Sequence, residues 1–185
     1  MSLVIRPVAP EDAEAIAAIY RPYVTDTVIT FELDPPDAAE MRARIERIVP
    51  THPWLVAEVD GAVLGYAYGS TYRTRAAYRW VAETGIYMAD AARGRGIGTP
   101  LYRALLDALA RRGFVAAMGV MTAGNPASTA LHERLGFVDT GTQPGIGYKH
   151  GGWHDVVFWQ KDLAPRAAEP GEPESGAPTS LTRSP

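Results

Sequence analysis

A glycine-rich segment is the part of the sequence best suited to chemistry. Residues 93–99 read Arg-Gly-Arg-Gly-Ile-Gly-Thr and stand between a β-prone run and an apolar segment with helical spacing. Backbone amides in such a turn can point outward with no side chain in the way, and a following helix N-terminus adds partial positive charge. The pattern favours a phosphate or pyrophosphate ligand, although a glycine turn without a ligand is equally common.

Two other phosphate motifs do not fit this segment. The dinucleotide-binding pattern Gly-x-Gly-x-x-Gly needs a glycine at its last position. Counting from Gly94, that position is Thr99, and counting from Gly96 it is Leu101. A P-loop needs a lysine after its glycines, but the first lysine of the chain is Lys149. Both motifs are therefore excluded.

One carboxylate, Glu83, interrupts the β-prone run of residues 80–88. A carboxylate held in a strand can take a proton from a substrate ammonium group, directly or through a water molecule. An amine must lose this proton before its lone pair can attack a carbonyl carbon. The competing interpretation is a glutamate on the outward, polar side of the strand, and the residues alone leave both open.

Residues 71–79 carry three arginines interleaved with tyrosines. A guanidinium group binds a carboxylate or phosphinate through two parallel hydrogen bonds. The segment therefore suits a small acidic molecule, and the alternative is an ordinary solvated loop.

The sequence gives little support for a metal site or for hydrolase chemistry. The chain has no cysteine, and His150 and His154 stand four residues apart in a glycine-rich stretch, so no metal site is expected. A serine hydrolase would need the motif Gly-x-Ser-x-Gly, which is missing. We expect Trp153, His154 and Asp155 to have a structural or dimer-interface role.

Hydrophobic spacing predicts the elements that position these residues. Helices are expected from Ala13 to before Val24, around 41–48, from Pro100 to Arg112 and from Asn125 to Gly136. Strands are expected over residues 3–5, 54–59, 62–70, 80–88, 114–121, 137–142 and 156–160. The turn Asp60-Gly61 predicts an antiparallel hairpin, and the strand–helix–strand unit around residues 93–99 predicts parallel pairing. The expected fold class is α/β (α+β), with a mixed sheet flanked by helices.

Composition limits the number of domains and the classes of partner that the chain can have. The chain has 185 residues, 46% hydrophobic and 21% charged, which fits one domain. A formal net charge of −3 gives no basic field for nucleic acid, and no apolar run reaches membrane-spanning length, so neither partner is expected. A cytoplasmic location is the expectation. The domain is predicted over residues 1–163, and the proline- and glycine-rich residues 164–185 are predicted to be a disordered tail.

Several ordered motifs resemble one known family. The pattern Arg-x-x-Gly-x-Gly at residues 93–98 is similar to the pyrophosphate-binding signature of the GCN5-related N-acetyltransferase (GNAT) superfamily. Further segments resemble its phosphinothricin and methionine sulfoximine acetyltransferase branch. They are ETGIY at 83–87, NPAS at 125–128, LHERLGF at 131–137 and GWHDV at 152–156. The resemblance runs from about Val4 to Leu163.

The resemblance implies a fold and a coenzyme-binding surface. In the GNAT fold, the strand before the glycine-rich segment and the strand after its helix splay apart, and the pantetheine arm of acetyl-CoA lies between them. The implied coenzyme-binding residues are Ile86, Tyr87, Met88, Arg93, Gly94, Arg95, Gly96, Ile97, Gly98, Thr99 and Asn125. Pro100 departs from the pattern because it removes one backbone amide at the helix start.

The resemblance also implies catalytic residues. Glu83 would be the general base. His132 would lie near the coenzyme sulfur, where it could relay a proton or fix a water molecule. Tyr87, Tyr148 and solvent are alternative proton donors.

Substrate residues and assembly follow from the same resemblance. Arg75 first and Arg73 second would hold an amino-acid carboxylate, with Phe31 as an apolar wall. A homodimer is implied as well.

These features predict an acetyl-CoA-dependent N-acetyltransferase acting in a ternary complex. The expected substrates are small amino acids such as phosphinothricin, methionine sulfoximine or methionine sulfone. Two alternatives stay open: a GNAT acetyltransferase for another small amine or a protein N-terminus, and a coenzyme A-binding regulator without turnover.

Overall fold

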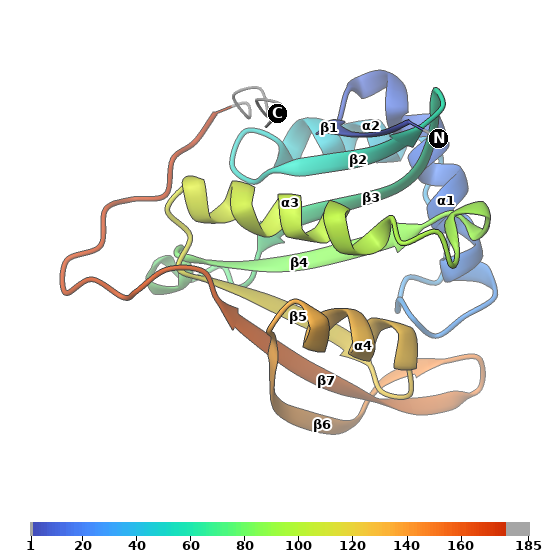
Figure 1. The fold of residues 1–185 in the computed structure, drawn as a ribbon. Helices are drawn as coiled ribbons and strands as arrows, with labels where there is room; N and C mark the ends of the chain where they lie inside the picture. The colour runs from blue at the N-terminus through green and yellow to red at the C-terminus, as the bar shows by residue number, and fades with distance from the viewer. Residues whose placement is uncertain (1, 177–185) are drawn as a thin grey trace.

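A seven-stranded mixed sheet forms the centre of the computed structural model, which describes residues 2–176 (Figure 1). Its strands are β1 (Leu3–Pro7), β2 (Trp54–Val59), β3 (Ala62–Thr71), β4 (Val81–Met88), β5 (Ala116–Thr122), β6 (Val138–Lys149) and β7 (Gly152–Asp162). They lie in the order β1-β2-β3-β4-β5-β7-β6. Among the strands of the described residues, only β4 and β5 pair in parallel, so the predicted mixed sheet is confirmed.

Helices cover both faces of the sheet, as Figure 1 shows. The helices α1 (Ala13–Thr25) and α2 (Ala38–Ile48) lie on one face, and α3 (Gly98–Arg111) and α4 (Pro126–Arg134) lie on the other. Short 3-10 turns occur at Pro10–Asp12, Ala76–Tyr78 and Asp90–Ala92. Within residues 2–176, no helix is both long and apolar enough to cross a membrane.

Side-chain caps fix the starts of two helices. The Asp37 carboxylate accepts a hydrogen bond from the Glu40 amide at 2.8 Å before α2. The Asn125 side-chain oxygen accepts one from the Ser128 amide at 3.1 Å before α4. Each cap satisfies a backbone donor that the helix itself leaves unpaired.

Each face of the sheet has its own apolar core. The stripe of α3 packs on one face, where Leu101, Leu105 and Leu109 are fully buried against β2, β3 and β5 residues. On the other face, α1 and α2 cover an aromatic surface that includes Trp54 and Tyr66. Burial of these two faces fixes which side chains of β4 point to each side, because successive strand residues alternate.

The parallel pair separates partway along its length. Pairing of β4 with β5 runs from Val81 opposite Ala116 to Thr84 opposite Gly119 and then stops. β4 nevertheless continues to Met88, so backbone groups beyond Thr84 face a gap instead of β5. The predicted splay is therefore confirmed.

The last hairpin is longer than predicted. The expected strands end at residue 142 and resume at 156, whereas β6 and β7 continue to the turn at His150-Gly151. Residues 144–146 bulge out of the register, and the Gly145 amide donates to Asp155 at 2.8 Å. A proline and glycines give this stretch a loop-like composition, and the bulge lets the strand accommodate them.

Helix α3 also starts two residues earlier than expected, at Gly98 instead of Pro100. Pro100 therefore occupies the first turn, where a missing amide breaks no intrahelical hydrogen bond.

Residues 164–176 contain neither helix nor strand, yet they contact the domain. Trp80 Nε1 donates to the Gly171 carbonyl at 2.6 Å, and Arg79 pairs with Glu172. The Gly176 amide donates to the Pro50 carbonyl at 2.8 Å. The rest of the predicted tail, residues 177–185, lies outside the described residues.

Candidate functional site

A groove of about 630 Å³ opens where β4 and β5 separate. Residues from both faces of the sheet line it, including Tyr23 of α1 and Tyr102 of α3, so the groove passes between the two strands. Of the predicted site residues, it is lined by Ile86, Tyr87, Met88, Arg93, Gly94, Gly96, Ile97, Gly98, Asn125 and His132. The structure thus brings together segments predicted separately from the sequence.

The glycine-rich segment forms one end of this groove. Gly94 and Gly96 have φ values of +72° and +71°, which side chains with a Cβ rarely adopt. A Cβ at either position would meet no atom within 4 Å, so backbone conformation, and not crowding, requires glycine. The segment leads into the N-terminus of α3 at Gly98, as an anion-binding turn would.

Two predicted residues of this segment lie outside the groove. Arg95 and Thr99 do not line it, and the Arg93 guanidinium, which does, is paired with Asp90 at 2.8 Å. This pair is solvent-exposed and therefore weak, so it leaves Arg93 able to exchange partners.

Glu83 lies at the point where the strands begin to separate. It stands opposite Met118 of β5, one residue before Thr84, the first β4 residue that lines the groove. Burial raises the pKa of the Glu83 carboxyl above its ordinary value. No residue between 2 and 176 donates a hydrogen bond to it, so the carboxylate is open to a substrate proton.

His132 is buried in the groove wall with a defined tautomer. Its Nδ1 lies 2.8 Å from the Ser128 carbonyl, which can only accept, so Nδ1 carries the hydrogen. Its Nε2 lies 3.1 Å from the Tyr102 hydroxyl. Burial lowers the pKa of His132, which keeps the ring neutral and Nε2 free to accept.

The chain of polar groups continues to β4. The Tyr102 hydroxyl lies 2.7 Å from Thr84 Oγ1, which is 3.0 Å from the Met118 carbonyl. Sequence reasoning missed Tyr102 and Thr84, because a tyrosine in an apolar helix stripe and a threonine in a buried strand carry no distinguishing signal.

The predicted substrate residues are not gathered at the groove. Arg73 and Arg75 are exposed in the loop before β4, and the Arg73 guanidinium lies 5.1 Å from the Tyr72 ring centre and 5.4 Å from that of Tyr78. Phe31 packs instead on Gly147 of β6, where an added Cβ would be 2.0 Å from Phe31 Cζ.

The two tyrosines among the alternative proton donors differ in position. Tyr87 lines the groove, and burial raises the pKa of its hydroxyl well above the ordinary value. Tyr148 is exposed on β6 and does not line the groove.

Comparison with known proteins identifies the family. The profile of the acetyltransferase (GNAT) family matches residues 14–137, about two thirds of the chain. The chain belongs to the GNAT acetyltransferase family. The predicted family, GNAT fold and enzyme class are therefore confirmed, while the roles of individual residues stay predictions.

Relatives of this GNAT acetyltransferase cover nearly all of its domain. It is 39% identical to a phosphinothricin N-acetyltransferase of Streptomyces viridochromogenes, over 86% of this chain and 87% of that protein. It is 36% identical to an L-methionine sulfoximine/L-methionine sulfone acetyltransferase of Pseudomonas paraeruginosa, over 92% of this chain and 100% of that protein. Among solved structures, a phosphinothricin acetyltransferase of Sinorhizobium meliloti in complex with acetyl-CoA superposes with a TM-score of 0.87. That structure is 38% identical and covers 96% of each chain.

The position of His132 predicts the effect of a substitution at Gly119. A Cβ at Gly119 would lie 2.4 Å from His132 Nε2, so Gly119→Ala must displace the ring from Tyr102. We expect this overpacking to lower the free energy of unfolding by about 1–3 kcal/mol, measured by urea denaturation.

Two further variants control this prediction. Gly152→Ala is a strand control, because its Cβ would meet atoms no closer than 3.7 Å and should leave stability nearly unchanged. Combining Gly119→Ala with His132→Ala should remove the clash, so the two effects should be less than additive. A Gly119→Ala protein as stable as the wild type would contradict the close packing of His132 on Gly119.

Proposed function

We propose that this GNAT enzyme acetylates the α-amino group of small amino acids that carry a tetrahedral phosphorus or sulfur group. Phosphinothricin, methionine sulfoximine and methionine sulfone are the proposed substrates, and acetyl-CoA is the acetyl donor. The names of the relatives support this class. The observation that carries it is the groove through the split sheet, with an unpartnered carboxylate at the end of the strand pairing.

The groove fits an extended thioester coenzyme. The backbone of β4 at Ile86–Met88 lies beyond the pairing with β5 and would hold the pantetheine arm by strand-like hydrogen bonds. At Met88, the Tyr23 hydroxyl already bonds to the carbonyl at 2.7 Å and to the amide at 3.3 Å. The positive-φ glycines and the start of α3 would hold the pyrophosphate, with Arg93 adding charge. Asn125 lines the groove and caps α4, so its amide nitrogen remains free to donate to the arm.

Glu83 is proposed as the general base. Because burial raises its pKa, this carboxylate is a stronger base than an exposed glutamate. It takes a proton from the substrate ammonium. The amine nitrogen then bonds to the acetyl carbon while the carbon–sulfur bond breaks, and the sulfur leaves as a thiolate that takes up a proton.

His132 is proposed as a proton relay for that last step. Its Nε2 faces the Tyr102 hydroxyl, and with Thr84 these groups form a chain of exchangeable protons in the groove wall. The thiolate would be protonated from this chain.

The exposed arginines are proposed as the carboxylate anchor. Arg75 makes no ion pair with any residue of the described range 2–176, so its guanidinium is available. The Arg73 guanidinium lies over the adjacent rings of Tyr72 and Tyr78 and is the second choice.

A thiol-release assay tests the substrate class. Acetyl-CoA is offered with phosphinothricin, methionine sulfoximine, methionine sulfone, unmodified α-amino acids, simple amines and a peptide N-terminus. We expect turnover with the first three and little with the peptide. Coenzyme A binding without turnover on any of the three would contradict the substrate assignment, and turnover on the peptide alone would favour a protein substrate.

Glu83→Gln should lower kcat by about 10²–10⁴-fold, because the amide accepts no proton. In the wild type, kcat/KM should fall as the pH drops through the raised pKa of Glu83, above the ordinary glutamate range, since only the ionised carboxylate is a base. This fall of kcat/KM at low pH should be absent from the Glu83→Gln variant. Glu46→Gln, on the exposed side of α2, is the control. An unchanged rate in Glu83→Gln would overturn the role.

Gly96→Ala should weaken coenzyme A binding about tenfold, because a left-handed conformation costs a residue with a Cβ about 1–2 kcal/mol. Isothermal titration with coenzyme A measures this. Gly61→Ala is the matched control: it introduces the same strain at φ +87° in the β2–β3 turn, away from the groove. Equal affinity in both variants would contradict pyrophosphate binding by this turn.

We also propose a homodimer formed through the extended β6–β7 hairpin. Its exposed side chains Tyr148 and Trp153 pack against each other at 5.3 Å between ring centres, and Trp153 is 67% exposed, beside the exposed Ile146. Aromatic groups of this size on one exposed surface are typical of an interface.

Trp153→Ser with Tyr148→Ser should convert the dimer to a monomer of 20.0 kDa in light scattering. Val138→Ser, an equally exposed apolar position near the start of β6, should leave the mass unchanged. A monomeric wild type would rule out the dimer.

A further inference from the structure

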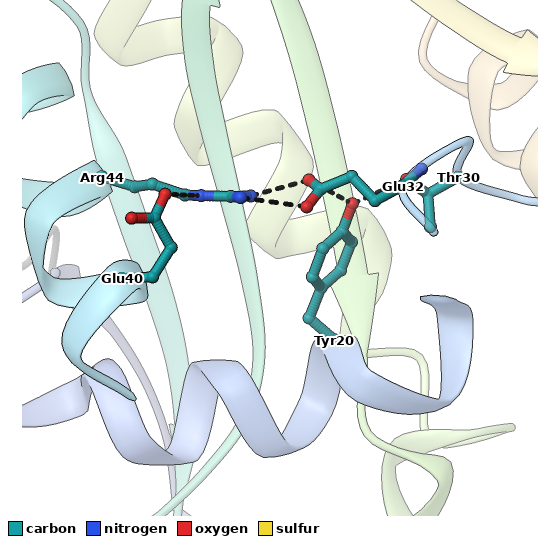
Figure 2. Close-up of polar contacts among 5 residues, drawn as sticks. All are labelled: Tyr20, Thr30, Glu32, Glu40 and Arg44. Carbon is teal, nitrogen blue, oxygen red and sulfur yellow. Dashed lines mark hydrogen bonds and ion pairs between the residues drawn. The ribbon is translucent and has the colours of Figure 1, made fainter. Parts of the chain in front are cut away.

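The segment Thr30–Glu32, between α1 and α2, is held by side chains of other elements although it has no regular structure. Arg44 of α2 donates two hydrogen bonds to the Glu32 carboxylate, at 2.7 and 3.0 Å, as Figure 2 shows. Tyr20 of α1 donates to the same carboxylate at 3.0 Å and lies 2.7 Å from Thr30 Oγ1. Four polar groups therefore meet at one short stretch of chain. We call Tyr20, Glu32 and Arg44 the brace.

The protonation states of the brace are fixed near neutral pH. Burial alone would raise the pKa of Glu32, but the hydrogen bonds from Arg44 and Tyr20 outweigh it and hold the pKa below the ordinary value. Burial raises the pKa of Tyr20 to about 12. Glu32 is thus a permanent acceptor and Tyr20 a permanent donor.

Further tethers hold the same segment from the other side. Buried Lys149 of β6 donates to the Thr30 carbonyl at 2.7 Å, and Thr122 of β5 donates to the Val28 carbonyl. Between them, Phe31 sits in the space left by Gly147, which lacks a side chain. The backbone around Phe31 is therefore tethered to β5 and β6 as well as to the brace, while the Phe31 ring, which is 37% exposed, lies over Gly147.

The brace borders the reaction site. The Tyr20 ring packs edge-on against Tyr87 at 4.8 Å between centres, and Tyr87 lines the groove. Ile29, next to the held segment, also lines the groove.

Stability is a poor explanation for such a cluster. A partly buried ion pair gains little net stability over apolar side chains of the same size, because both charges lose water. An arginine that donates two parallel hydrogen bonds to a carboxylate does, however, fix the relative orientation of the two groups. What the pair fixes here is the segment that carries Phe31.

We propose that Glu32 and Arg44 are positioning residues that hold Phe31 as a wall of the amino-acid site and so set the KM for the amine substrate. This inference rests on the proposed function. Neither side chain touches the reacting atoms, so their effect should appear in amine binding and not in the chemical step.

Steady-state kinetics of Arg44→Ala test the proposal. The KM for phosphinothricin should rise about tenfold, while kcat and the KM for acetyl-CoA stay within about twofold. Arg44→Lys keeps the positive charge but cannot donate two parallel hydrogen bonds to Glu32. Its KM for phosphinothricin should therefore lie between those of Arg44→Ala and the wild type. Arg42→Ala, exposed on the same helix, is the matched control and should behave like the wild type.

A double-variant cycle shows whether the brace acts through Phe31. In a Phe31→Ala background, Arg44→Ala should raise the KM for phosphinothricin no further, because the wall is already gone. Additive effects, or an Arg44→Ala protein with unchanged amine KM, would overturn the proposal. An equal rise in both KM values would overturn it too, because it would indicate general structural damage.

Hydrogen exchange separates this inference from the proposed function. Amides of residues 28–33 should exchange faster in Arg44→Ala than in Arg42→Ala, and unchanged exchange would overturn the brace whatever the substrate. A wild type without turnover on any amino acid contradicts the proposed function. If the wild type turns over these amino acids but the effects of Arg44→Ala and Phe31→Ala on KM are additive, only the role of the brace is contradicted.

Discussion

Beyond Thr84 and Gly119, the two parallel strands stop pairing, and the rest of the site depends on that separation. Unpaired backbone groups in the interior of a sheet are costly unless other groups satisfy them. Side chains pack at the apex of the gap: His132 occupies the space above Gly119, and Tyr102 joins it to Thr84. Helices α3 and α4 thus meet the sheet at the residue pair where pairing ends. Thr84, Tyr102 and His132, which form this polar chain, also line the groove.

The two carboxylates near the groove have opposite environments. Glu83 has no donor in the described range and a raised pKa, whereas Glu32 accepts from Arg44 and Tyr20 and has a lowered one. Groups whose surroundings push their pKa values apart usually divide the work of a site. Here the carboxylate free of partners suits proton transfer, and the one bound to Arg44 suits the fixing of geometry.

Local patterns predicted most of the fold and one end of the site. The Asp60-Gly61 turn, the apolar stripe of α3 and the glycine-rich segment each act through neighbours in sequence, so spacing alone reveals them. The contacts of His132 with Tyr102 and of Glu32 with Arg44 join residues 30 and 12 positions apart. No spacing rule indicates which of many tyrosines or arginines completes such a contact. The β6 bulge was missed for a related reason: proline and glycine look alike in a loop and in a strand whose bulge needs them.

Strand β4 gives the site its direction. The arginine-bearing loop precedes it, Glu83 stands where pairing ends, Ile86–Met88 line the groove, and the glycine-rich segment follows. Because an extended strand rises about 3.3 Å per residue, the loop and the glycine segment lie at opposite ends of β4. In the proposed complex, an amine held near the first end and a thioester held near the second would meet close to Glu83. The order of residues along one strand therefore places Glu83, the proposed base, between the two proposed sites. In this proposal, amine recognition falls to segments outside the groove, including the one that carries Phe31.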